Sequence, residues 1–550
     1  MKLKDRWFPF VIKIVIAVLF LGVVVATFSS GFEFGFAFFR ISMHDTRPAL
    51  VSILVLYLIL VFVTNPRLAS GRRWLKDHRW LALITFLVPV FALAAMALAV
   101  RSGLITPTVV PAEHVATRQS GKQVICIGVD GASFDVIKPL VDQGKLPNIE
   151  KLMQEGACGT LLSIESYRPI ADRRGIWSPV VWTSIATGKL PHRHGIVDYR
   201  LPAVHKPWKT EIAKSYHRRV KALWNILSTL KIRSGVVGWW TTWPAEPVDG
   251  FMVSSHVGLR GLPKRTVSAE GQAEQAVLRR LTFPEEYMHV LAENVPPPFE
   301  IDTLISERLF HIARCRARSS KEINSFRSVC YQDRYYADIG RFLLETEQPR
   351  FLFVYFESTD VASHLFWSFM VNGVPHPSRL EGCDPQRLRQ VVPNTYILID
   401  EMIGHLLEKA EEDATVIVIS DHGFKADSSN PQGSDHALDG IFIMKGPGIK
   451  KDEKLRHSGF LSRMGLSHPP ATILDVLPTL LYLYDAPVAL DLDGRVLFEA
   501  FDEDYVEKHP IRVIETYEGK KSRTGSPPAN EDTSLDDELM DRFKALNYIQ

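Results

Sequence analysis

Six residues whose side chains commonly bind metals stand at matching places in the sequence, close to the ends of apolar, strand-like runs. Three runs, at 124–129, 351–356 and 415–420, are each followed closely by an aspartate: Asp130, Asp360 and Asp421. Three histidines accompany them: His364 four residues after Asp360, His422 next to Asp421, and His436 in the polar loop at 433–436. A single Asp after a strand often caps a helix or forms a turn. All six together indicate a site for two divalent cations with positions open for substrate, and mixed Asp and His ligation suits zinc, with manganese as the alternative.

A candidate nucleophile lies in the segment from Ile176 to Gly188. Ser178 precedes a proline, and Pro is favoured in the first turn of a helix, so Ser178 is predicted to be the N-cap. Capping alone would account for this serine, but the free N–H groups of a helix N-terminus also stabilise an alkoxide or a bound phosphate. Thr183 and Ser184, one turn further along, are expected to face helix packing and are the weaker candidates.

The elements that must position these residues are strands of a sheet. From Gln123 onward, short β-branched runs alternate with helical stretches, which is typical of an α/β domain with parallel strands. In open α/β sheets, ligands bind beyond the carboxyl ends of the strands. We therefore expect the three aspartates to converge on one crevice.

Three apolar runs open the chain, at about 8–28, 49–64 and 80–100, and each approaches the roughly 20 residues of a transmembrane helix. A cleaved signal peptide would explain one run but not two more behind it, and buried core helices are the remaining alternative. Basic residues at 2–6 and 67–79 favour a cytoplasmic position for both flanking segments. We therefore predict an integral membrane protein with a cytoplasmic N-terminus and, after Arg101, a catalytic domain on the periplasmic or extracellular side.

The expected organisation is a transmembrane anchor at 1–103, a linker at 104–122, a catalytic domain at 123–517 and a flexible C-terminal tail at 518–550. Within the tail, 536–546 could form a short helix. A helical, Arg-rich stretch at about 269–341 is interpreted either as an insertion that caps the crevice or, more simply, as a solvated helical face.

Composition excludes some functions. Lys and Arg total 64 against 62 for Asp and Glu, so nothing favours broad electrostatic capture of nucleic acid. The five cysteines form neither a disulfide framework nor a Cys-based zinc site. Cys126 lies in an apolar run and is predicted to be plain core, and a bridge between Cys315 and Cys330 stays open.

A series of motifs between about Val124 and Leu497 points to a known family. They are Ile127-Gly128-Val129-Asp130-Gly131, Leu146-Pro147-Asn148, the Ser178 segment, His194-Gly195-Ile196, Asp360-Val361-Ala362-Ser363-His364, Ser420-Asp421-His422-Gly423, His436 with Gly446-Pro447-Gly448-Ile449, Asp475-Val476-Leu477-Pro478-Thr479 and Asp493-Gly494. In order and spacing the chain resembles the alkaline phosphatase superfamily, in its type I phosphodiesterase/nucleotide pyrophosphatase branch. The resemblance implies a mostly parallel sheet flanked by helices.

The resemblance also implies roles for the residues. One metal would be held by Asp360, His364 and His436, and a second by Asp130, Asp421 and His422, with Ser178 between them as the nucleophile that is transiently phosphorylated. Two divalent ions, zinc favoured over manganese, would serve the hydrolysis of phosphodiester or pyrophosphate bonds. The substrate is thus a phosphate ester of unassigned identity.

Two segments are treated separately: one differs from the family pattern, and the other looks like a further metal-binding cluster. The family members that cleave nucleotides usually have an asparagine shortly after the His-Gly-Ile motif, whereas this chain has Tyr199, which could donate a hydrogen bond or only pack. His192 and His194 look like a ligand cluster, but the resemblance assigns them no metal, and we interpret His194 as a residue that fixes its loop.

Alternative functions come from the same superfamily and from outside it. A membrane phosphoethanolamine-type transferase would pass the phosphoryl group to a lipid or glycan, and a phosphomonoesterase would use a different ester. A sulfatase is disfavoured because no Cys-x-Pro-x-Arg segment occurs. A catalytically inactive scaffold is disfavoured because every ligand position carries a competent Asp or His.

Overall fold

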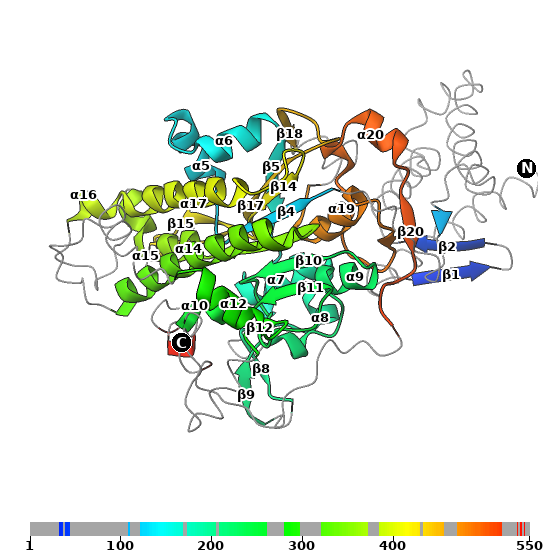
Figure 1. Cartoon of the computed structure of the whole chain (residues 1–550), viewed down its shortest axis with the longest axis horizontal. Coiled ribbons are helices and arrows are strands. Elements are labelled where there is room, and N and C mark those ends of the chain that lie inside the picture. Colours follow the sequence, from blue (N-terminus) through cyan, green and yellow to red (C-terminus); the bar gives the residue numbers. More distant parts are fainter. Residues whose placement is uncertain are drawn as a thin grey trace, which may run out of the picture. The chain divides into compact units, whose positions relative to one another are not determined.

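The computed structural model describes residues 122–168, 173–204, 208–260, 280–296, 321–371, 384–429, 433–455 and 470–519, with shorter pieces at 32–36, 39–43, 108–109, 374 and within 536–544 (Figure 1). The chain divides into two compact units, Met1–Thr106 with His457–Pro469, and Pro107–Arg456 with Pro470–Gln550. In the first unit the structure describes β1 (Phe32–Phe36) and β2 (Phe39–Met43), which pair antiparallel.

The three predicted membrane spans lie outside the described residues. Among the helices that the structure describes, none combines the length and the apolar character needed to cross a bilayer. The membrane anchor and the sidedness of the catalytic domain therefore stay predictions.

The second unit is organised around a nine-stranded sheet. Its order is β12 (Thr282–Phe283), β11 (Gly250–Val253), β10 (Ser234–Val237), β13 (Phe351–Phe356), β4 (Val124–Val129), β14 (Thr415–Ile419), β17 (Asp439–Lys445), β5 (Ala157–Leu162) and β18 (Glu453–Leu455). The five strands from β11 to β14 run parallel, while β12 and β17 are antiparallel to their inner neighbours. The predicted α/β domain with a mostly parallel sheet is confirmed.

The strands that precede the three aspartates are neighbours at the centre of this sheet. β4 lies between β13 and β14 and pairs in parallel with both. At their carboxyl ends, Val129 is opposite Phe356 and Gly128 is opposite Ile419. All three strands are buried along their whole length, which accounts for their unbroken apolar sequences. The register brings the residues after these strands to one edge of the sheet, as expected.

Helices cover the sheet in two groups. α14 (Lys321–Glu347), α15 (Ser358–Met370) and α17 (Val391–Leu407) pack against one another side by side (Figure 1). α7 (Ser178–Thr187) packs against α19 (Val476–Leu483). α15 begins two residues after β13 ends, so its first turn lies at the carboxyl edge of the central strands.

Part of the stretch predicted as a capping insertion at about 269–341 is described. β12 is the edge strand of the sheet, α12 (Tyr287–Asn294) follows it, and α14 packs on β13 with residues such as Val329 and Tyr336 buried. These parts are elements of the α/β body. Residues 261–279 and 297–320 lie outside the described ranges, as does Cys315 of the bridge left open above. Cys126 is buried core in β4, as predicted, and burial raises the pKa of its thiol to about 12.

The C-terminal tail was predicted to be flexible, but its described residues dock on the second unit. Asp536 and Leu539 lie in a helical segment, as expected for a short helix at this place. A carboxylate oxygen of Asp536 lies 2.8 Å from Nζ of Lys214, and both side chains are buried. Leu539 joins the main hydrophobic core. An ion pair and apolar burial thus hold Asp536 and Leu539 of the tail against the rest of this unit.

Candidate metal centre

The six residues predicted to bind metals lie together in two groups of three. Asp360, His364 and His436 form the first group, and Asp130, Asp421 and His422 form the second. Within each group, one potential ligand atom from every residue lies within 4.8 Å of the others. The structure therefore brings together all six side chains, in the two sets that the resemblance implies.

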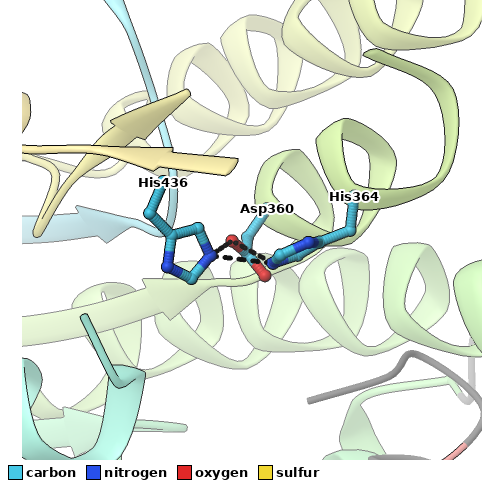
Figure 2. A group of neighbouring side chains, drawn as sticks. All are labelled: Asp360, His364 and His436. Carbon is cyan, nitrogen blue, oxygen red and sulfur yellow. Dashed lines mark hydrogen bonds and ion pairs between the residues drawn. The ribbon is translucent and has the colours of Figure 1, made fainter. Parts of the chain in front are cut away.

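The first group combines one helix and one hairpin (Figure 2). Asp360 and His364 are four residues apart in α15, so they lie on the same face, one turn apart. His436 comes from β16 (Ser434–Ala437), which pairs with β15 (Gly423–Ala426). The two Nε2 atoms are 2.8 Å apart, and Oδ1 of Asp360 lies 3.5 Å from His364 and 3.6 Å from His436. Two nitrogens and one oxygen thus face a common point.

The second group sits directly beyond the central strands. Nε2 of His422 lies 3.3 Å from Oδ1 of Asp130 and 3.7 Å from Oδ2 of Asp421. The same nitrogen is 3.6 Å from Oδ1 of Asp360, which belongs to the first group. Nδ1 of His422 donates to the carbonyl of Gly423 at 3.0 Å, so Nε2 is turned toward the carboxylates. The two groups are therefore adjacent, with Asp360 between them.

The electrostatics of the second group call for a cation. Asp130, Asp421 and His422 are buried, and Oδ1, Oδ2 and Nε2 respectively have no hydrogen-bond partner within the described part of the chain. Burial and then the charge of Asp130 raise the pKa of Asp421 well above its ordinary value. Burial lowers the pKa of His422, but Asp421 and Asp130 outweigh that effect and raise it to about 10. Buried carboxylates this close need positive charge to offset their repulsion, which a protonated His422 supplies without metal and a bound cation would supply in its place.

The donor atoms fit a pair of divalent metal ions. Each group has three protein ligands, which leaves positions open for a substrate oxygen, and Asp with His is a ligand set that zinc accepts. Burial lowers the pKa of His364 to about 4, so its imidazole is neutral at physiological pH, as a ligand must be.

The ring of Phe424 packs against three histidines of the site, a contact that was not predicted from the sequence. Its ring centroid lies 5.0 Å from His364, 5.6 Å from His422 and 5.2 Å from His436. Gly131 permits this packing, because a Cβ there would lie 2.8 Å from Phe424 and 3.0 Å from the Cα of Asp360, at a φ of 66°. Nothing in the sequence around Phe424 distinguishes it from an ordinary strand residue.

Ser178 is the first residue of α7, and the N-cap is Trp177, so the predicted capping position was wrong by one residue. The side chain of Ser178 therefore has no part in capping the helix. Residues on both sides of Ser178 are hydrogen bonded to the two groups of candidate ligands. Nδ1 of His436 donates to the carbonyl of Ile176 at 3.2 Å, and Nε1 of Trp182 donates to Oδ2 of Asp130 at 2.9 Å. The segment from Ile176 to Trp182, which includes Ser178, is thus held beside the candidate metal sites.

The other hydroxyl groups of α7 are used structurally, as expected. Thr183 donates to the carbonyl of Pro179 at 2.6 Å, and Ser184 donates to that of Val180 at 3.0 Å. His194 contacts Ser184 through Nε2 at 2.9 Å and accepts the N–H of Ile196 through Nδ1 at 3.2 Å. Burial lowers the pKa of His194 to about 3, so its ring is neutral. The interpretation of His194 as a residue that fixes its loop is confirmed.

Tyr199 packs in an aromatic cluster next to this helix. Its ring meets Trp177 edge to face at 6.5 Å and Trp240 at 6.1 Å, and only 2% of its surface is exposed. The structure shows this packing, and the hydrogen-bonding role considered for Tyr199 stays a prediction.

Asp333 on α14 is a further polar residue behind the site. Its buried carboxylate accepts the backbone N–H of Glu357 at 2.9 Å and that of Ser358 at 2.7 Å. These N–H groups are the free donors at the start of α15, the helix that carries Asp360 and His364. Asp333 thus fixes the first turn of that helix, although it is distant from it in sequence.

Asp333→Asn should change how stability depends on pH. Burial raises the pKa of Asp333 from 3.8 to about 7, so between these values the folded chain keeps a proton that the unfolded chain releases. The stability contributed by this group is therefore present at low pH and lost as pH rises toward 7. Urea unfolding should show that wild type loses up to about 1.4 kcal/mol per pH unit relative to the variant in this window. A difference that does not vary with pH would contradict this account.

The fold and the two groups of candidate ligands are those of a phosphoesterase-type hydrolase. More specifically, the chain belongs to the type I phosphodiesterase / nucleotide pyrophosphatase family, whose model matches residues 124–470, more than half of the chain. This confirms the resemblance seen in the motifs. Among curated proteins, none matches the chain.

Several solved structures are similar in part. Phosphonoacetate hydrolase from Sinorhizobium meliloti is 16% identical over 56% of this chain, with a TM-score of 0.34, and the match spans 58% of that hydrolase. A putative sulfatase from Bacteroides thetaiotaomicron is 13% identical over 68% of this chain and 73% of its own, with a TM-score of 0.39. Human ectonucleotide pyrophosphatase / phosphodiesterase 5 is 12% identical over 70% of this chain and 99% of its own, with a TM-score of 0.37.

Proposed function

We propose that this protein hydrolyses phosphodiester or pyrophosphate bonds, with Ser178 as the nucleophile and two divalent cations held by the two groups. The observation that carries the proposal is the adjacency of the groups. His422 of the second group lies 3.6 Å from Asp360 of the first, and the chain on either side of Ser178 is hydrogen bonded to both groups, Ile176 to His436 and Trp182 to Asp130. One phosphoryl group could therefore meet both sites and the serine at once.

In the proposed reaction, Oγ of Ser178 attacks phosphorus and forms a new P–O bond as the bond to the leaving group breaks. The proton of Oγ passes to the oxygen of the leaving group, and water then cleaves the seryl phosphodiester, releasing the phosphate monoester and restoring the serine hydroxyl. Two bound zinc ions would lower the pKa of a coordinated hydroxyl and polarise the phosphoryl oxygens.

The side chains around Ser178 support this role. Thr183 and Ser184 already donate to backbone carbonyls of α7. Both ring nitrogens of His194 are already hydrogen bonded, Nε2 to Ser184 and Nδ1 to the N–H of Ile196, so it does not compete as a base or ligand. Ser178 is thus the hydroxyl of this helix that remains available next to both groups.

The proposal is tested on the full-length chain by metal analysis and turnover. About two zinc ions per chain are expected, as a two-metal site requires. Aryl phosphate diesters should be cleaved, and rapid quenching should trap phosphate on the peptide that contains Ser178. A chain that binds no metal and cleaves neither aryl diesters nor monoesters would contradict the proposal. Transfer of the phosphoryl group to an added lipid acceptor, without release to water, would replace the hydrolase with a transferase.

A further inference from the structure

The two oxygens of the Asp130 carboxylate have different surroundings. Oδ2 accepts two hydrogen bonds, one from Nε1 of Trp182 at 2.9 Å and one from the hydroxyl of Tyr355. Oδ1 has no hydrogen bond within the described part of the chain and lies 3.3 Å from Nε2 of His422. The carboxylate therefore has one oxygen fixed by the protein and one oxygen turned toward the candidate metal site.

Tyr355 is held as a donor to Asp130. Its hydroxyl accepts the indole N–H of Trp240 at 2.7 Å, so its own proton is directed to the carboxylate. Parallel pairing places Tyr355 opposite Gly128, two residues before Asp130 on the neighbouring strand. Strand register thus determines the direction of this hydrogen bond.

Trp182 reaches Asp130 because one glycine makes room for it. Its ring packs edge to face on Trp239 at 5.0 Å and on Tyr355 at 5.1 Å. A Cβ on Gly128 would lie 2.6 Å from this ring, so the glycine of the Ile127-Gly128-Val129-Asp130-Gly131 motif is required for the contact. The buried indole has little freedom to move, and its N–H is aimed at Oδ2.

We propose that Trp182 and Tyr355 are positioning residues that bind Oδ2 of Asp130 and thereby present Oδ1 alone to the cation. This inference rests on the proposed role of Asp130 as a metal ligand. In a buried site, hydrogen bonds to a carboxylate are strong, and partners behind a ligand fix its orientation. Without them the carboxylate can rotate or bind through both oxygens.

Trp182 also connects this arrangement to the nucleophile. Ser178 and Trp182 are four residues apart in α7 and therefore lie on one face of the helix, one turn apart. The indole N–H of Trp182 joins that face directly to Asp130. The distance between the serine and the second metal site is thus set by a single rigid turn of helix.

The test compares Tyr355→Phe and Trp182→Phe with two matched controls. Tyr336→Phe removes a buried hydroxyl that bonds to backbone groups of Ser255 and Gly258, and Trp224→Phe removes an indole N–H that donates to Glu246 at 2.6 Å. Zinc affinity of the full-length protein is measured by competition with a chelator. We expect about 10-fold to 100-fold weaker binding of one of the two ions in both test variants, and unchanged affinity in both controls.

The outcomes separate this inference from the proposed function. Wild-type affinity for both ions in Tyr355→Phe and Trp182→Phe would overturn the inference while leaving the function intact. A wild-type chain that binds no zinc would overturn the function and, with it, the inference. If Trp182→Phe does not fold, Tyr355→Phe decides, because it removes one oxygen atom and keeps the ring packed.

Discussion

Ser178→Ala should lower kcat by about 1000-fold or more while both metal ions remain bound. The substitution removes the attacking oxygen, and it leaves the ligand groups and the hydrogen bonds from Trp182 and His436 unchanged. Because the N-cap is Trp177 and not Ser178, little stability should be lost. Steady-state turnover on an aryl diester, metal content and the melting temperature measure these effects.

Ser184→Ala is the matched control for this loss, since it removes a buried hydroxyl from the same helix. Ser184 bonds to the carbonyl of Val180 and to His194, so its loss should cost about 1 kcal/mol of stability and leave kcat within a few-fold of wild type. Full activity in Ser178→Ala would mean that another group attacks phosphorus, and the alignment of this helix with the family motif would have to be revised.

Asp421→Asn should have opposite effects on the metal-free and the metal-loaded protein. Without metal, burial and Asp130 make the charge of Asp421 unfavourable, which is why its pKa is raised well above its ordinary value. A neutral amide should therefore stabilise the metal-free chain by more than about 1 kcal/mol. With zinc present, the variant should bind one ion much more weakly and lose about 1000-fold or more in kcat.

The matched control for this prediction is Asp435→Asn. Asp435 precedes His436 in β16, but its side chain is 53% exposed and its ion pair with Lys425 is 3.7 Å long. Its replacement should change stability by less than about 0.5 kcal/mol and leave metal content unchanged. If metal-free Asp421→Asn were no more stable than metal-free Asp435→Asn, the buried carboxylates would not repel one another, and the argument for a cation between them would be lost.

Much of the candidate site follows from local sequence alone. Asp130, Asp360 and Asp421 each follow a strand, and parallel strands share their carboxyl edge, so their convergence could be predicted before any contact was known. Asp360 and His364 share a helix face because they are four residues apart. Composition and motif order were enough for the α/β class and the family.

The surroundings of the site required the tertiary structure. The N-cap of α7 is Trp177 and not the predicted Ser178. The position of a cap depends on the backbone angles at which the chain enters the helix, and the sequence limits these angles without fixing them. Asp536, in the tail predicted to be flexible from its polar composition, forms an ion pair with Lys214, which lies 322 residues earlier in the chain.

The residues that orient the candidate ligands could not be predicted from the sequence either. Trp182 and Tyr355 reach Asp130 across 52 and 225 residues, and Asp333 fixes the start of α15 from another helix. The positions of strand ends and helix turns follow from the local sequence pattern, and so do the residues that occupy them. The distant aromatic or carboxylate residue that hydrogen bonds to a ligand is determined by how the strands and helices pack. Packing brings together residues that have no regular spacing in the chain, so the sequence pattern does not reveal these partners.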